Sequence, residues 1–141
     1  MRLYLAGPLF TQAERRWLRE LAGLLRERGH RVFLPQDEAE EEPDAARLFE
    51  INRGGIDGCE ALVAVLDGAD ADSGTCWECG YAVGLGKPFV AVRTDFRGGD
   101  DRGLNLMLRR SASAVIEREP GDERLEPLVA AIDDALGGLE A

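Results

Sequence analysis

The chain has 141 residues, the length of one ordinary domain, and its 45% hydrophobic and 31% charged residues are typical of a folded globular protein. With 17 basic and 27 acidic residues, the net charge of −10 argues against partners that are polyanions, which excludes most DNA, RNA and anionic membrane surfaces. No apolar run is long enough to span a membrane, and an odd number of cysteines, three, favours free thiols. We therefore expect a cytoplasmic protein with a single domain, residues 1–141, that acts on small molecules.

Apolar runs alternate with amphipathic segments along the chain, which predicts an α/β fold with a mostly parallel sheet. Strands are expected at 3–6, 31–34, 61–66, 88–93 and 112–116, and helices at 11–29, 44–57, 75–85, 104–110 and 123–136. Loops are expected at 37–44, 67–74 and 94–103. Five strands in this order fit a flavodoxin-like (Rossmann-like), doubly wound sheet with strand order 2-1-3-4-5. In that topology a ligand lies beyond the carboxyl ends of the first and third strands, where segments 7–10 and 67–78 fall.

The segment with the most chemistry lies after the third strand. A helix beginning at Thr75 puts Glu78 in its first turn, where the helix dipole favours an ionised carboxylate, and such a carboxylate over a pocket is a competent nucleophile. Asp72, six residues earlier, can approach the same pocket from the loop. Two carboxyl groups in different environments are the usual equipment for breaking a glycosidic bond. The alternative is structural, with Glu78 as a helix-end charge and Asp72 as a turn former.

Cys76 and Cys79 form a CxxC motif at the start of the same helix, which raises redox chemistry or a zinc site as alternatives. The motif follows the third strand rather than an early one, and only Cys59 and His30 remain as further ligands, without ligand spacing. Packing of two small side chains is therefore the preferred interpretation. The helix start is also a candidate to hold a phosphate, although the spacing of a P-loop is absent.

Several segments, taken together and in this order over about residues 1–107, resemble the nucleoside 2-deoxyribosyltransferase family. The most specific is DSGTCWECGYAVGLGKP at 72–88, and the others are LYLAGPLF at 3–10, VFLPQ at 32–36, RTDFR at 93–97 and NLM at 105–107. By this resemblance Glu78 is the nucleophile that takes the sugar at its anomeric carbon. Asp72 is the carboxyl that hydrogen-bonds and protonates the leaving base, and Tyr4 is the strand residue that orients the glutamate.

The resemblance also implies how the substrate is held. Asn105 and Met107 are expected to complete the site of a neighbouring subunit near the sugar hydroxyls, which implies a homo-oligomer. Asn52 stands near a sugar-contacting position that is often Asp in the family, so the sugar preference stays open. The expected substrate-binding residues are Gly7, Pro8, Phe10, Asn52, Ser73, Gly74, Trp77, Asn105 and Met107. From their side chains alone, and not from the resemblance, Phe10, Trp77 and Met107 are expected to form an apolar, stackable base pocket.

The function hypothesis is a transferase that exchanges the nucleobase of 2′-deoxynucleosides by a retaining double displacement through a glutamyl-sugar ester. No metal or organic cofactor is expected, because the nucleophile and the acid are both side chains. The expected partners are nucleosides, free nucleobases and further copies of the chain. One alternative is an N-glycosidase, with the same nucleophile but water as the acceptor, that acts on nucleosides or deoxynucleoside 5′-monophosphates. Another is a non-catalytic nucleotide-binding module.

Overall fold

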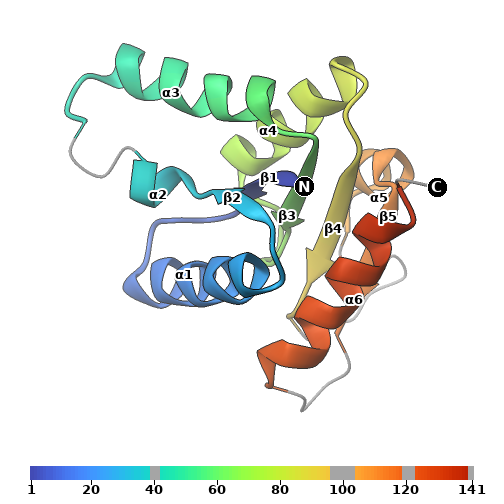
Figure 1. The fold of residues 1–141 in the computed structure, drawn as a ribbon. Helices are drawn as coiled ribbons and strands as arrows, with labels where there is room; N and C mark the ends of the chain where they lie inside the picture. Colours follow the sequence, from blue (N-terminus) through green and yellow to red (C-terminus); the bar gives the residue numbers. More distant parts are fainter. Residues whose placement is uncertain (39–41, 96–103, 119–122, 140–141) are drawn as a thin grey trace.

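The computed structural model describes residues 1–38, 42–95, 104–118 and 123–139 as one domain built on a five-stranded sheet (Figure 1). All the strands run parallel, in the order β2-β1-β3-β4-β5. This confirms the predicted fold class and strand order. The elements in chain order are β1 (Arg2–Ala6), α1 (Gln12–Glu27), β2 (Arg31–Phe33), α2 (Pro35–Glu38), α3 (Ala45–Gly58), β3 (Ala61–Val65), α4 (Ser73–Gly84), β4 (Phe89–Arg93), α5 (Leu106–Ser111), β5 (Ala114–Glu117) and α6 (Leu125–Gly137).

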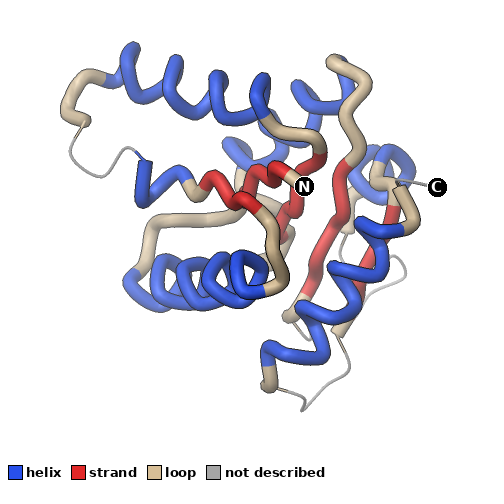
Figure 2. Tube along the Cα trace, viewed as in Figure 1, coloured by secondary structure: helices blue, strands red, loops and turns tan. Residues whose placement is uncertain are grey.

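Helices cover both faces of the sheet, with α1 and α6 on one face and α3, α4 and α5 on the other (Figures 1 and 2). Because successive side chains of a strand point to opposite faces, β1 divides its residues between the two layers. Leu3 and Leu5 pack in the core under α1 and α6, whereas Tyr4 and Ala6 pack in the core under α3, α4 and α5. The register of β1 therefore decides that Tyr4 faces α4.

Two local predictions about the region after the second strand were inaccurate. β2 ends at Phe33, and Pro35 begins a single helical turn, α2, where a loop was expected from residue 37. Proline is well suited to the first position of a helix, because its missing N–H is not needed there. Asp44 then caps α3 by accepting hydrogen bonds from the backbone N–H groups of Ala46 and Arg47. Residues 39–41 and 96–103, parts of two predicted loops, lie outside the described residues.

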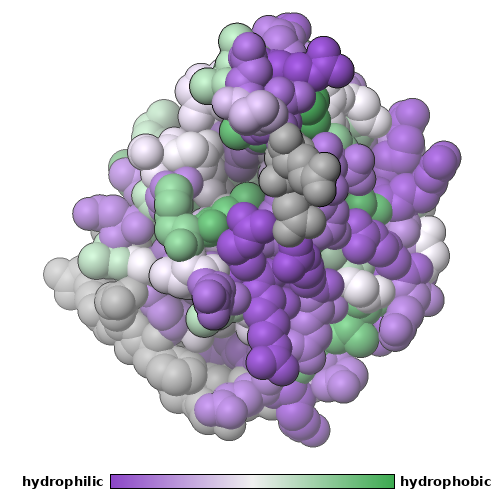
Figure 3. Space-filling view, turned by 90° about the vertical axis from the view of Figure 1, so that its left-hand side faces the viewer, coloured by the Kyte–Doolittle hydropathy of each residue, from purple (hydrophilic) through white to green (hydrophobic). Residues whose placement is uncertain are grey.

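Among the described residues, no helix combines the length and the apolar character needed to cross a membrane. Figure 3 shows that the described surface on the side of the molecule it views is mostly hydrophilic, with only small hydrophobic areas. This agrees with the high content of charged residues.

Candidate active site

A hydrogen bond between β1 and α4 joins two residues that are 74 positions apart in the sequence. The hydroxyl of Tyr4, a fully buried residue, donates to Oε1 of Glu78 at 2.5 Å. Tyr4 reaches α4 because it occupies the middle of β1 on the face of the sheet that this helix covers. The structure thus brings together the tyrosine and the glutamate that the sequence analysis paired.

The helix that carries Glu78 begins two residues earlier than predicted. Ser73 is its first residue, and Asp72 is the N-cap, whose carboxylate accepts from the backbone N–H of Thr75. Glu78 therefore lies in the second turn of α4, and the influence of the helix dipole falls off within the first turn. The sequence argument that the dipole acts directly on Glu78 was wrong for this reason.

The protonation of Glu78 is set by burial instead. Burial raises its pKa from 4.5 to about 7, the hydrogen bond from Tyr4 opposes that rise, and the negative charge of Asp72 adds to it. The expectation that Glu78 simply stays ionised is therefore corrected, because near neutral pH the carboxyl group titrates. Burial, followed by the charge of Glu78, raises the pKa of Tyr4 far above its usual value, so the phenol keeps its proton and acts as a donor.

The two carboxylate oxygens of Asp72 have different surroundings. Its Oδ2 atom accepts from the backbone N–H of Thr75 at 2.9 Å and from the Thr75 hydroxyl at 3.2 Å. A Cβ on Gly74 would come within 3.1 Å of the same oxygen, so a glycine leaves room for this cap. In the described part of the chain Oδ1 has no hydrogen-bond partner, and that oxygen is the one a ligand can use. The Asp72 carboxylate can therefore cap α4 through Oδ2 and contact a ligand through Oδ1.

Three predicted substrate-binding residues lie on the elements around this pair. Asn52, on α3, buries its Oδ1 atom without a hydrogen-bond partner among the described residues, and a buried unsatisfied amide oxygen is suited to receive a ligand hydroxyl. Trp77, 47% exposed, stacks on Tyr81 with ring centroids 5.1 Å apart. Gly7 follows β1, and a Cβ there would come within 3.3 Å of α1 and β3 side chains.

Other predicted residues are exposed or line one of two grooves. Phe10 and Met107 are 78% and 74% exposed, and Asn105 caps α5 by accepting from the backbone N–H of Met107 at 2.8 Å. Asn105 and Met107 line a groove of about 400 Å³ against α4, whereas Pro8 lines another of about 460 Å³ beside α1. Ser73 is exposed at the start of α4. Phe10, Trp77 and Met107, the residues of the expected base pocket, are all exposed in the single chain.

The cysteines of the CxxC motif are not activated thiols. Burial raises the pKa of Cys79 to about 12 and also raises the pKa of Cys76, so neither is the low-pKa thiolate that redox chemistry requires. Cys79 packs in the core beneath α4. This supports the packing interpretation of the motif.

The sequence analysis missed two basic residues that hold backbone segments around the site in place. Arg93, at the end of β4, is buried and donates to the carbonyl oxygens of Leu66 and Gly68 at 2.8 and 3.0 Å, which anchors the loop leading to α4. Lys87 donates to the carbonyl oxygens of Asp57 and Cys59 at 2.8 and 2.6 Å, which ties down the end of α3. Both residues lie in segments that carry the family resemblance. Their roles depend on hydrogen bonds to distant backbone carbonyl groups, which no sequence pattern reveals.

Comparisons with known proteins identify the family of the chain. The family model described as nucleoside 2-deoxyribosyltransferase matches residues 3–108. A conserved protein from Enterococcus faecalis V583 has a similar crystal structure, with a TM-score of 0.76, 26% identity, and coverage of 95% of this chain and 98% of that one. A 2-deoxyribosyltransferase from Bacillus psychrosaccharolyticus has a TM-score of 0.69 and 27% identity, over 84% and 87% of the two chains.

A CMP N-glycosidase from Clostridium botulinum has the same fold, with a TM-score of 0.66 and 19% identity over 94% and 98% of the two chains. None of the curated proteins compared with the sequence matches it. The family model covers all of the chain from β1 to the middle of α5, including both members of the hydrogen-bonded pair. The chain therefore belongs to the nucleoside 2-deoxyribosyltransferase family.

Proposed function

We propose that the protein transfers the 2-deoxyribosyl group from one nucleobase to another and that Glu78 is the nucleophile. The observation that carries the proposal is the partly buried hydrogen bond from Tyr4 to Glu78. It fixes Oε1 and leaves Oε2 as the oxygen that attacks. Asp72, whose charge acts on Glu78, supplies the second carboxyl group that the chemistry needs.

The reaction is a double displacement. In the reactive form Glu78 is ionised and Asp72 carries a proton. Oε2 of Glu78 forms a bond to C1′ while the bond from C1′ to the base nitrogen breaks. The departing base keeps the electron pair of the broken bond and takes the proton from Asp72. An incoming base then attacks C1′ and gives its proton to Asp72, and the carboxylate of Glu78 leaves. Two inversions at C1′ restore the original configuration.

The attack requires the ionised form of Glu78. Since its pKa is about 7, the ionised fraction falls about tenfold for each pH unit well below that value. The same burial that raises the pKa makes the carboxylate more basic and less solvated when it is ionised, which favours attack on carbon. Base release should therefore decline on the acid side of neutrality.

The first test replaces Glu78 by glutamine, which keeps the shape of the side chain and removes the nucleophile. Release of hypoxanthine from deoxyinosine by Glu78→Gln should fall about a thousandfold or more. The control is Glu126→Gln, an exposed carboxylate in the first turn of α6, which should release base at the wild-type rate. Near-wild-type turnover by a folded Glu78→Gln protein would refute the mechanism.

The identity of the acceptor separates transfer from hydrolysis. Adenine added to deoxyinosine should speed the consumption of the nucleoside and appear as deoxyadenosine, because a positioned base reaches the ester more readily than water does. Chromatography gives the ratio of deoxyadenosine to free deoxyribose over a range of adenine concentrations. If free sugar dominates at saturating adenine, the protein is an N-glycosidase, and the transferase assignment is wrong.

We infer in addition that copies of the chain associate and complete one another's sites. The supporting observations are the exposed apolar side chains of Leu106 and Met107 on α5 and of Val83 on α4. They flank the groove between these helices, whose lining is mainly apolar and small. Large apolar side chains of this kind on one surface are typical of an interaction site.

Mixing two impaired variants tests whether sites are shared between subunits. Met107→Ala should have reduced activity. In an equimolar mixture of Met107→Ala with Glu78→Gln, about a quarter of all sites should be fully active if the assembly is a dimer, because half of the dimers are mixed and one of the two sites in each is intact. Light scattering gives the mass of the assembly in the same solutions. A fully active monomer, or a mixture no more active than its parts, would contradict the inference.

A further inference from the structure

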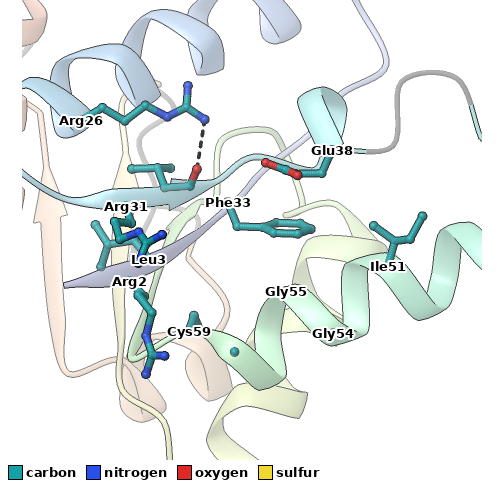
Figure 4. Close-up of a pocket in the computed structure, with 12 residues that line it drawn as sticks. Arg2, Leu3, Arg26, Arg31, Phe33, Glu38, Ile51, Gly54, Gly55 and Cys59 are labelled. Atoms are coloured by element: carbon teal, nitrogen blue, oxygen red, sulfur yellow. Dashed lines mark hydrogen bonds between the residues drawn. The ribbon is translucent and has the colours of Figure 1, made fainter.

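The ring of Phe33 lies between the candidate catalytic tyrosine and α3. It stacks on the ring of Tyr4 with centroids 5.2 Å apart and an angle of 12° between the planes. β1 and β2 pair with Tyr4 and Phe33 in register, which places the two rings side by side on the same face of the sheet. Figure 4 shows the Phe33 side chain pointing from β2 towards Gly54 and Gly55 of α3.

The other side of the Phe33 ring meets α3 at a glycine. A Cβ built on Gly55 would lie 2.7 Å from Cε1 and Cζ of Phe33 and 2.8 Å from Cδ1, far inside the separation of about 3.5–4.0 Å that carbon atoms prefer. Glycine is a poor helix former, and its presence in the interior of α3 has a steric reason here. It lets the helix approach closely enough to clamp the ring against Tyr4.

We propose that Gly55 and Phe33 are positioning residues that hold the Tyr4 hydroxyl against the carboxylate of Glu78. The inference rests on the proposed role of Glu78 and extends it to a chain of contacts from α3 through β2 and β1 to α4. Tyr4 is fully buried in a closely packed interior. A displacement of Phe33 therefore also moves the Tyr4 ring. Phe33 itself lines a groove of about 640 Å³ along the edge of β2, into which the ring can turn when a Cβ on Gly55 displaces it, so that it no longer supports Tyr4.

The neighbouring glycine provides a matched control. Gly54 lies in the same helix, and a Cβ there meets nothing within 4 Å among the described residues. Gly54→Ala and Gly55→Ala therefore make the same gain in helix propensity, but only Gly55→Ala presses on Phe33. Tyr4→Phe, which removes the hydrogen bond directly, shows the effect of complete loss.

The readout is the titration of Glu78. The hydrogen bond from Tyr4 lowers the pKa of Glu78, so a weakened bond raises it, and the charged form that attacks becomes scarcer at low pH. The titratable groups that face this pair are Tyr4 on β1, Asp72 before α4, Cys79 on α4 and Cys59 after α3. None of them is changed in the glycine variants.

We expect Gly55→Ala to move the acid limb of kcat/KM upwards by about half a pH unit or more, which is about a threefold loss of activity at pH 6. Gly54→Ala should keep the wild-type limb, and Tyr4→Phe should shift it in the same direction as Gly55→Ala. Phe33→Leu, which removes the stacked ring without adding bulk, should shift it as well. In the Phe33→Leu background, Gly55→Ala should add little, because its effect passes through the ring.

A folded Gly55→Ala protein with the same acid limb of kcat/KM as Gly54→Ala would overturn the proposal. It would also be overturned if the shift in the double variant equals the sum of the shifts of Gly55→Ala and Phe33→Leu. If Gly55→Ala does not fold, Phe33→Leu decides alone, and an unshifted limb overturns the proposal. A second readout is the carboxyl ¹³C titration of Glu78 by NMR in the resting protein. It measures the same shifts without turnover, so an inactive wild-type protein would refute the proposed function while the positioning role would still be decided.

Discussion

The carboxyl group of Glu78 lies beneath a helix and against the face of a sheet, where its charged form loses solvation. The hydrogen bond from Tyr4 offsets part of that loss. Desolvation favours the protonated acid and brings its pKa to about 7. A hydrogen bond to a charged group contributes about 1.5–3 kcal/mol, so the donor is needed to keep the charged form accessible near neutral pH. The result is a carboxylate that is basic, poorly solvated and fixed at one oxygen.

The fold supplies each part of this arrangement from a different element. β1 presents Tyr4 from the middle of the strand, α4 brings Glu78 over it, and the cap at Asp72 sets where α4 begins. The loop before α4 is held by Arg93 at the end of β4, on the far side of β3 from β1. Small displacements in any of these elements change the distance between the phenol and the carboxylate, which is why contacts remote from the chemistry matter.

Much of this was accessible from the sequence. The alternation of apolar runs and amphipathic segments predicts the parallel sheet, because helices between successive strands are typical of a doubly wound fold, and that fold implies the strand order. The block containing Asp72 and Glu78 is specific enough to identify the family and the pair of carboxyl groups. The spacing alone, however, placed Glu78 in the wrong turn of α4, because Asp72 can serve as a helix cap and no pattern shows that it does.

What the sequence could not reveal depends on contacts between distant segments. The burial of Glu78, and hence its raised pKa, follows from packing against a strand 74 residues away. The clamp of Phe33 between Tyr4 and Gly55 joins three elements that have no local signature in common. Phe10, Trp77 and Met107 were grouped because their side chains are apolar and stackable. All three are exposed in the single chain, which makes the association of subunits part of the functional question.

Mass spectrometry of the protein quenched with acid during turnover of deoxyinosine shows whether Glu78 forms a covalent bond to the sugar. We expect a protein species heavier by one deoxyribosyl residue, with the added mass on the peptide that contains Glu78. The species should disappear in Glu78→Gln and should be depleted when adenine is added. Steady turnover with no modified protein at any quench time, or a modification on another residue, would contradict a covalent bond between Glu78 and the sugar.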